Sequence, residues 1–194
     1  MIWLFIIGII VVLMVTHYTV DEPRIKEQKN EQEKSEQEYI KSNHITVTTQ
    51  YRYASDYYTQ NINWTRGISY RFIVDEQNKK IHILSHNGYR NAIPFSDIIG
   101  CEIVSDNQII GGIKRAIVGG VLAGETGALV GAMTAQPHIM SYSIVIYRSN
   151  LQMPTVTIPL IKEKVSTKST DYTSAVEFSQ KVLASIKAII HING

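Results

Sequence analysis

Cysteine is almost absent from this chain of 194 residues, which holds Cys101 and no other thiol. One thiol excludes an internal disulfide and any metal or redox site built on paired cysteines. A basic excess is also lacking, because 19 Lys and Arg stand against 17 Asp and Glu, for a formal net charge of +2. Nucleic-acid-binding proteins carry a larger positive charge. We therefore expect no nucleic-acid partner.

The motifs of catalysis and cofactor binding are missing too. The sequence has no G-x-S-x-G elbow, no P-loop and no G-x-G-x-x-G turn after a strand. His82 and His86 stand four positions apart, but no acidic or thiol ligand is near them in sequence, which disfavours a metal site. Cys101 lies in an apolar strand pattern typical of a small core residue rather than a nucleophile. These absences predict a non-enzymatic protein with no catalytic residue, cofactor or metal.

Charged side chains are absent from residues 1–20. The stretch from Ile2 to Val20 is almost wholly apolar and, at about 1.5 Å per helical residue, matches the ~30 Å hydrocarbon core of a bilayer. A signal peptide would need a basic start and small residues before the cleavage point, and neither is present. The segment is therefore predicted to be an uncleaved transmembrane anchor.

The orientation of this anchor follows from the basic residues around it. None precedes the apolar stretch, and several follow it in residues 24–41. In membrane proteins, the cytoplasmic side of a membrane span carries the excess of Lys and Arg. We expect a single-pass protein of the inner (cytoplasmic) membrane of a bacterium, with the N-terminus outside and the C-terminal domain in the cytoplasm. A free Cys101 agrees with that reducing compartment.

Residues 21–41 form a charged segment in which acids and bases interleave. No heptad of apolar residues is present, which argues against a coiled coil. Opposite charges four residues apart, such as Lys29 and Glu33, support a solvated helix. We expect a stalk that holds the domain away from the bilayer, and the alternative is a segment that recruits a partner.

The remaining residues, 42–194, form the predicted folded domain. Strand patterns cover residues 45–53, 68–74, 80–84, 89–94, 98–105, 141–147 and 155–158. The pair Asn87-Gly88 indicates a hairpin turn between two of them. Apolar residues at helical spacing over 172–190 predict a closing amphipathic helix. The expected fold is mainly β with a C-terminal α-helix, in a small barrel or sandwich plugged by the helix at one end.

Two runs in this domain carry a resemblance to a known family. Residues 72–83 (FIVDEQNKKIHI) and 93–104 (IPFSDIIGCEIV) resemble bacterial pleckstrin-homology-like (PH-like) domains of the PH/GRAM superfold. The likeness covers about residues 64–191. The second run is similar to small bacterial and phage-associated proteins that pair this domain with a glycine-rich insertion. The resemblance implies binding of lipid, peptide or protein, and it implies no catalytic residue.

The glycine-rich insertion, residues 111–135, has small residues every fourth position in two rows. Glycine costs a helix about 1 kcal/mol per residue, so this density points to close helix packing, as in membrane small-xxx-small contacts. The segment is read in three ways: as a second membrane span, as a surface between copies, or, preferably, as a helical hairpin turning at residues 124–127. The small residues expected to mediate membrane contact or self-association are Ala116, Gly119, Gly120, Ala123, Gly124, Gly127, Ala128 and Gly131.

Basic residues near the hairpins and the insertion are candidates for contact with anionic lipid. They are Lys79, Lys80, Arg90, Lys114 and Arg115. The expected partners are membrane lipid and either a second copy or another protein. The predicted function is a membrane-anchored binding or scaffold module. The alternative is a membrane-active, oligomer-forming protein of the toxin or phage-exclusion type.

Overall fold

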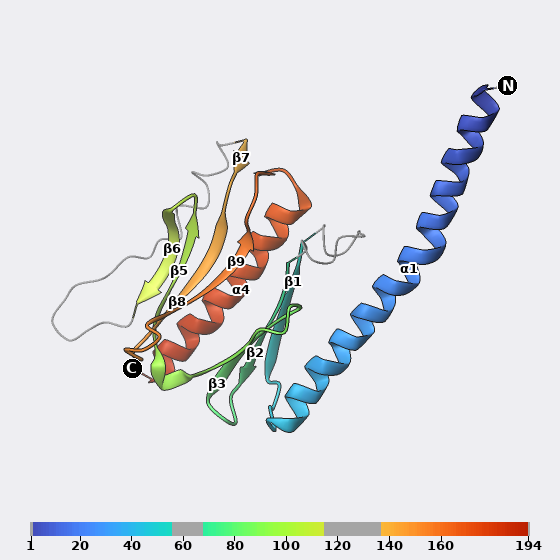
Figure 1. Cartoon of the computed structure of the whole chain (residues 1–194). Helices are drawn as coiled ribbons and strands as arrows, with labels where there is room; N and C mark the ends of the chain where they lie inside the picture. The colour runs from blue at the N-terminus through green and yellow to red at the C-terminus, as the bar shows by residue number, and fades with distance from the viewer. Residues whose placement is uncertain (1, 56–67, 115–136, 194) are drawn as a thin grey trace.

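Two antiparallel sheets and a long C-terminal helix make up the domain in the computed structural model, which describes residues 2–55, 68–114 and 137–193 (Figure 1). The helices are α1 (Ile2–Ser42), the short 3-10 helix η1 (Phe95–Asp97) and α4 (Thr170–Asn193). The strands are β1 (Thr49–Ala54), β2 (Ser69–Asp75), β3 (Lys80–Ser85), β4 (Arg90–Pro94), β5 (Ile98–Ser105), β6 (Gln108–Lys114), β7 (His138–Ile139), β8 (Tyr142–Arg148), β9 (Thr155–Ile161) and β10 (Val165–Ser166).

The strands are paired with their neighbours in antiparallel fashion. The first sheet has the order β1-β2-β3-β4, the second the order β6-β5-β8-β9, and β7 pairs with β10. In the first sheet Phe72 stands opposite Ile83, and Ile81 stands opposite Ile93. This register places the large apolar side chains of alternate positions on one face.

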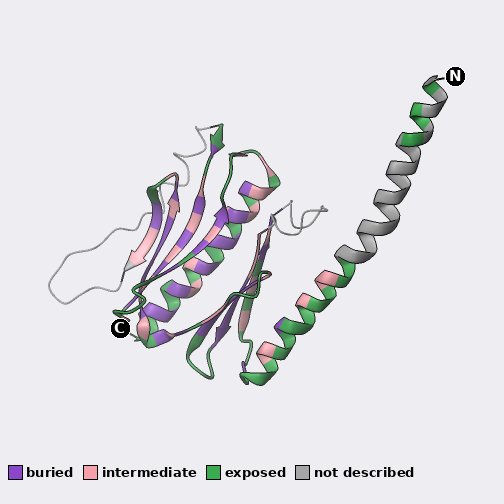
Figure 2. Cartoon of the chain, in the orientation of Figure 1, coloured by how far each residue is buried: buried purple, intermediate pink, exposed green. Residues whose placement is uncertain are grey.

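The core lies between the two sheets and is completed by α4. Buried side chains of α4 recur at helical spacing, among them Ala175, Phe178, Val182 and Ile186. They join one apolar cluster with the inner faces of both sheets (Figure 2). The helix contacts β1 of the first sheet and β5 and β9 of the second. The predicted mainly β fold with a C-terminal helix is thus confirmed.

The hairpin turn predicted at Asn87-Gly88 is also confirmed. It joins β3 to β4, and Gly88 has a φ of +84°, a conformation that glycine adopts without a steric penalty. The side-chain oxygen of Asn87 accepts hydrogen bonds from the Ser85 hydroxyl at 2.7 Å and the Tyr89 backbone N–H at 3.2 Å. Local sequence therefore fixes this turn.

Strand β6 includes residues that the sequence pattern assigned to the glycine-rich insertion. Residues 111–114 pair with β5, and Gly112 lies against Glu102. A Cβ at Gly112 would lie 2.8 Å from Glu102 Cγ and 3.0 Å from the Cys101 carbonyl oxygen, so this position requires glycine for the approach of two backbones. The strand patterns had not predicted β6 or the two-residue strands β7 and β10.

Helix α1 is one element of 41 residues that runs from Ile2 to Ser42. It includes both the apolar N-terminal stretch and the charged segment, which the sequence pattern predicts as a separate anchor and stalk. Over the described residues, the structure shows no helix with the length and apolarity needed to span a membrane.

Candidate functional site

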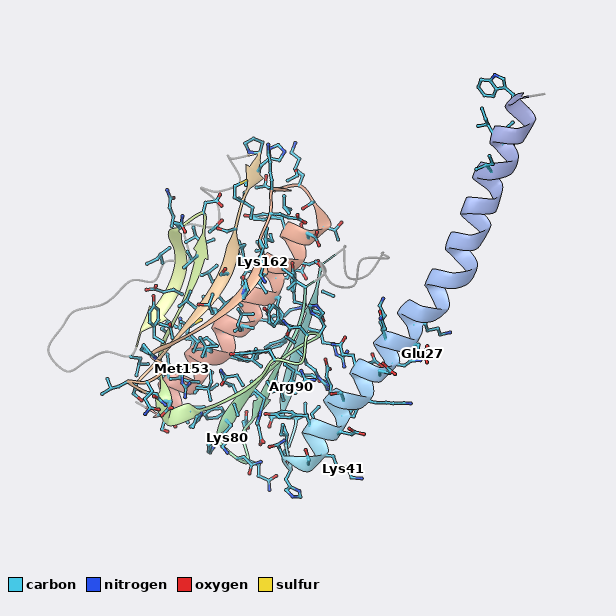
Figure 3. The ribbon with its side chains drawn as sticks, viewed as in Figure 1. Glu27, Lys41, Lys80, Arg90, Met153 and Lys162 are labelled. Atoms are coloured by element: carbon cyan, nitrogen blue, oxygen red, sulfur yellow. The ribbon has the colours of Figure 1, made fainter. Side chains whose placement is uncertain are left out.

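The candidate lipid-contact lysines of the first sheet lie at one end of it. Lys79 and Lys80 are exposed at the turn between β2 and β3. Arg90 lies at the opposite end of the β3–β4 hairpin, because Lys80 pairs with Pro94 whereas Arg90 pairs with Leu84 (Figure 3). The structure therefore does not bring Arg90 together with Lys79 and Lys80.

Arg90 is instead held by groups of its own chain. Its Nη1 donates to the carbonyl oxygens of Ser85 at 2.8 Å and Tyr89 at 2.9 Å. Its guanidinium carbon lies 5.9 Å from the centre of the Tyr39 ring on α1, and Nη2 lies 3.4 Å from the Ser35 hydroxyl. Arg90 thus contributes to the contact between α1 and the sheet.

The predicted self-association residues cannot be placed in the same way. Arg115 and the small residues from Ala116 to Gly131 lie outside the described residues, and so does the side chain of Lys114. The backbone of Lys114 ends β6 opposite Gly100, whereas the chain resumes in β7, beside β10.

Polar and apolar side chains together join α1 to the outer face of the first sheet. We call this interface the α1–sheet contact. It comprises Gln32, Glu36, Tyr39 and Ile40 of α1, Ile45 after the helix, and Gln50, Arg52, Arg71, Ile73, Asp75, His82 and Leu84 of the sheet region.

A buried ion pair lies at the centre of the α1–sheet contact. Glu36 and Arg71 are only 4% and 6% exposed, and Glu36 Oε2 lies 3.4 Å from Arg71 Nη1. Arg71 Nε also donates to the side-chain oxygen of Gln50 at 2.8 Å. Burial, followed by the nearby Arg52, lowers the pKa of Arg71, and Glu36 opposes that shift. The carboxylate thus compensates a cation taken out of water.

Apolar side chains secure the end of the helix beside this pair. Ile73 and Leu84 are fully buried on the outer face of the sheet, and together with Ile45 they form a second apolar cluster. Tyr39 and Ile40 pack against it from α1. Burial of these side chains supplies the favourable energy that a polar interface lacks.

His82 and Asp75 form the third part of the contact. His82 Nε2 lies 3.8 Å from Asp75 Oδ2, and His82 Nδ1 lies 3.5 Å from the Tyr39 hydroxyl. Burial lowers the pKa of His82, against the effect of Asp75. Burial acts to raise the pKa of Asp75, but hydrogen bonds from Asn78 and Thr46 outweigh it and lower that pKa. The lowered pKa values of both groups favour, near neutral pH, a neutral His82 imidazole beside an ionised Asp75 carboxylate.

The chain leaves α1 through a Schellman motif. The backbone N–H of Ile45 donates to the Ile40 carbonyl at 3.0 Å, and that of His44 donates to the Lys41 carbonyl at 3.2 Å. His44 has a φ of +50°, the left-handed conformation of this motif, and Ile45 makes with Ile40 the apolar contact that often accompanies it. The junction between helix and sheet is therefore a closed turn rather than an open linker.

The direction of α1 across the sheet follows from its contacts. Ile40 packs near Ile73, whereas Lys29, farther toward the N-terminus, lines a cavity of 150 Å³ with Ala54 and Ser69. Ala54 and Ser69 lie at the end of the sheet where β1 connects to β2. The N-terminal half of α1 therefore extends past that end. Figure 1 shows β7 and the start of α4 on the same side.

A larger cavity, of 340 Å³, lies at this same end of the domain. It is lined by residues of both sheets and of the loop before α4, including Ser55, Tyr70, Ser85, His86 and Lys162. His86 Nδ1 accepts a hydrogen bond from the Ser69 backbone N–H at 3.2 Å. Burial lowers the pKa of His86, and Lys162 acts in the same direction.

The structure separates the two histidines that the sequence placed four positions apart. His82 lies on the outer face of β3, and His86 lies beyond the strand, at the 340 Å³ cavity. Across residues 2–55, 68–114 and 137–193, no three His, Cys, Asp or Glu side chains gather as a metal site would need. Cys101 is fully buried, as its apolar strand predicted.

Comparison with known proteins identifies relatives from a bacteriophage and its host. The chain is 42% identical over 60 residues to the "Immunity protein" of Bacillus phage SPbeta, a match that covers 30% of this chain and 27% of that protein. It is also 42% identical over 60 residues to the SPbeta prophage-derived membrane protein YomJ of Bacillus subtilis strain 168, covering 30% of this chain and 24% of YomJ. The chain thus spans about a quarter of these curated relatives. No solved structure shows a significant match.

The family comparison covers more than half of the chain. Residues 55–162, which include β2 to β9 and the glycine-rich insertion, match the family described as glycine zipper containing PH domain. The sequence resemblance to PH-like domains with a glycine-rich insertion is thereby confirmed. This chain belongs to the family of glycine zipper containing PH domains.

Proposed function

We propose that the chain is a non-enzymatic scaffold or binding module held at the cytoplasmic face of a bacterial membrane by residues 1–20. The observation that carries this proposal is the buried contact of Glu36 with Arg71. It attaches the domain to the same uninterrupted helix that contains the apolar stretch. At ~1.5 Å per residue, about 24 Å of helix separates Val20 from Glu36. The domain would stand at a fixed distance and orientation from the bilayer.

The relatives and the family support a role at a membrane. YomJ is named a membrane protein. The glycine zipper of the family supplies small residues at the spacing that allows close helix packing. In this proposal the small residues from Ala116 to Gly131 contact the membrane or a second copy, while the PH-like domain binds lipid or a protein partner.

A second candidate function comes from the name of the phage relative. The SPbeta protein is called an immunity protein. By analogy, the chain would act in the exclusion of competing phages, through copies that assemble by their glycine zippers and perturb the bilayer. A scaffold and a membrane-active oligomer share the same residues and differ in their effect on membrane permeability.

Flotation of the full chain with lipid vesicles tests the anchoring. We expect the protein to float with neutral and anionic vesicles and to remain bound at high salt, because salt screens charges but does not weaken an inserted apolar helix. Release of the chain by salt would contradict the anchor. Catalytic turnover by the purified full chain would contradict the non-enzymatic assignment.

Substitution of the zipper separates the two functions. Leucine at Gly120, Gly124 and Gly127 should abolish cross-linking between copies in vesicles, since larger side chains prevent close helix approach. A scaffold predicts no dye leakage from vesicles before or after the change. A membrane-active oligomer predicts leakage that the change removes. The matched control places leucine at Ile117, Val118 and Val121, which lie outside the two rows of small residues.

A further inference from the structure

We infer that the end of the domain formed by β7, β10 and the first turn of α4 faces an anionic lipid bilayer and contacts its headgroups. This inference rests on the anchoring proposed above and names the surface that the anchor turns toward the membrane. The residues that carry it are Lys162, Lys164 and Lys168, which are all exposed.

The direction of α1 determines which end of the domain faces the anchor. From Ile40, packed on the sheet, the helix passes Lys29, beside Ala54 and Ser69, and continues toward residues 1–20. About 14 Å of helix, at ~1.5 Å per residue, lies between Lys29 and Val20. The domain end beyond Ala54 and Ser69 therefore approaches the bilayer most closely. In Figure 3 the labelled Lys162 lies nearer this end of the domain than the labelled Lys80 does.

The 340 Å³ cavity links the lysine-bearing loop to the same end. Ser55 and Ile68, which flank the β1–β2 connection, line this cavity together with Lys162 and Val165. Val165 begins β10, which pairs with β7 through Ile139. The shared lining of this cavity and the pairing of β10 with β7 therefore place the loop from β9 to α4 beside the point where α1 leaves the domain.

The charges of this end suit an anionic surface. Three lysines occur within residues 162–168, with Glu163 as the exposed acid among them. The carboxylate of Asp106, at the β5–β6 turn, already accepts the backbone N–H groups of Met140 at 2.8 Å and Ser141 at 2.9 Å. Asp171 lies in the first turn of α4, where the helix dipole offsets its charge. Lysines near the cytoplasmic leaflet are attracted by its negative potential.

An apolar side chain accompanies the lysines. Met140, directly after β7, is 58% exposed, and His138 of β7 is exposed beside it. A surface that is partly apolar and partly basic binds well at a lipid interface. The methylene groups of its side chains reach the boundary of the acyl chains, while the lysine ammonium groups contact lipid phosphates. By contrast, Lys79 and Lys80 lie at the β2–β3 turn, where the Asn78 side chain bonds the His44 carbonyl at 3.0 Å, at the remote end of α1.

Depth-dependent fluorescence quenching tests the orientation. The full chain carrying Lys168→Cys or the matched control Lys80→Cys is labelled with a fluorophore and reconstituted into anionic vesicles that contain spin-labelled phospholipid. Both changes remove one exposed lysine. Cys101 stays unlabelled because it is fully buried. We expect quenching at position 168 to be severalfold stronger than at position 80, because a spin label quenches only at short range and Lys80 lies at the β2–β3 turn, at the other end of the first sheet.

Equal quenching at the two positions, or stronger quenching at position 80, would overturn the inference. A second pair repeats the comparison if a variant of the first pair fails to fold: Lys164→Cys, and Lys187→Cys at an exposed position in the C-terminal half of α4. Failure of the anchoring has a different result, since the unlabelled full chain would then not float with the vesicles. A chain that floats but shows no difference in quenching refutes this surface alone.

Discussion

Glu36 of α1 and Arg71 of β2 form an ion pair that is almost completely buried, with 3.4 Å between Glu36 Oε2 and Arg71 Nη1. The two residues lie 35 positions apart, on elements that the sequence pattern assigned to a solvated stalk and to a folded domain. Their contact makes the end of the charged segment part of the domain's structure. It also gives α1 a fixed position on the sheet, on which the proposed orientation at the membrane depends.

Removal of one partner of this pair should strongly destabilise the α1–sheet contact. We expect Arg71→Ala to lower the free energy of unfolding by about 3–5 kcal/mol, because it leaves the Glu36 carboxylate buried without its cation. Urea denaturation of the full chain in detergent micelles measures the change. The control is Glu38→Ala, an exposed position of the same helix, which should change stability by less than about 0.5 kcal/mol. Equal effects of the two variants would show that Glu36 and Arg71 do not interact.

The Schellman motif at the end of α1 predicts a stabilising substitution. His44 holds a φ of +50°, a conformation that costs a residue with a Cβ roughly 1–2 kcal/mol relative to glycine. His44→Gly should therefore raise the free energy of unfolding by up to about 1 kcal/mol, and His44→Val should lower it. The same denaturation experiment measures both variants. A loss of stability in the glycine variant would contradict the positive φ.

Two histidines should make the protein less stable in mild acid. Burial lowers the pKa values of His82 and His86 in the folded state. The unfolded chain, with an ordinary histidine pKa of about 6.5, then binds more protons, so stability rises with pH and is lost as the pH falls below about 6.5. The urea midpoint should decrease between about pH 7.5 and about pH 5.5.

Single substitutions assign this pH dependence to its groups. His82→Gln and His86→Gln should each reduce the change in urea midpoint over that pH range, since each removes one group that takes up a proton on unfolding. His191→Gln is the control, because His191 is exposed on the last turn of α4. An unchanged pH profile in both test variants would show that the two imidazoles titrate normally in the folded protein.

The thiol of Cys101 should be unreactive until the protein unfolds. Burial, followed by the nearby Glu102, raises its pKa to about 12, and the side chain is fully buried. The thiolate is the reactive form, so a thiol reagent at about pH 8 should modify the native chain very slowly and the urea-unfolded chain at once. In the Lys168→Cys variant one thiol should react immediately. Rapid modification of the native parent chain would contradict this burial.

The local sequence pattern was sufficient to predict the elements whose geometry repeats every few residues. Alternating apolar residues predicted the first sheet and β5, β8 and β9 of the second, and three- and four-residue spacing predicted α4, because these periods follow from the geometry of a pleated strand and a helix. The Asn87-Gly88 turn was predicted for the same reason, since its backbone conformation depends on two adjacent residues. Cys101 was assigned to the core because its neighbours in β5 are apolar.

The local sequence pattern was insufficient to predict the burial of a side chain whose partner lies far away in the chain. Glu36 looks like any exposed acid in a charged helix, and Arg71 and His82 look like the polar positions of a half-exposed strand. A signal was present in Tyr39, Ile40 and Ile45, apolar residues next to the charged segment, but they are too few to define a helical face. The strands β7 and β10 are two residues each, too short to show a period.

The amino-acid order alone thus decided where α4 and most of the long strands lie, because those choices depend on neighbours a few residues away. It also carried the family resemblance in residues 72–83 and 93–104. Only the tertiary structure decided that α1 packs on the first sheet, which charges are buried there and which end of the domain lies toward residues 1–20. Those properties arise from contacts between residues far apart in the chain, whose burial and pairing no local period encodes.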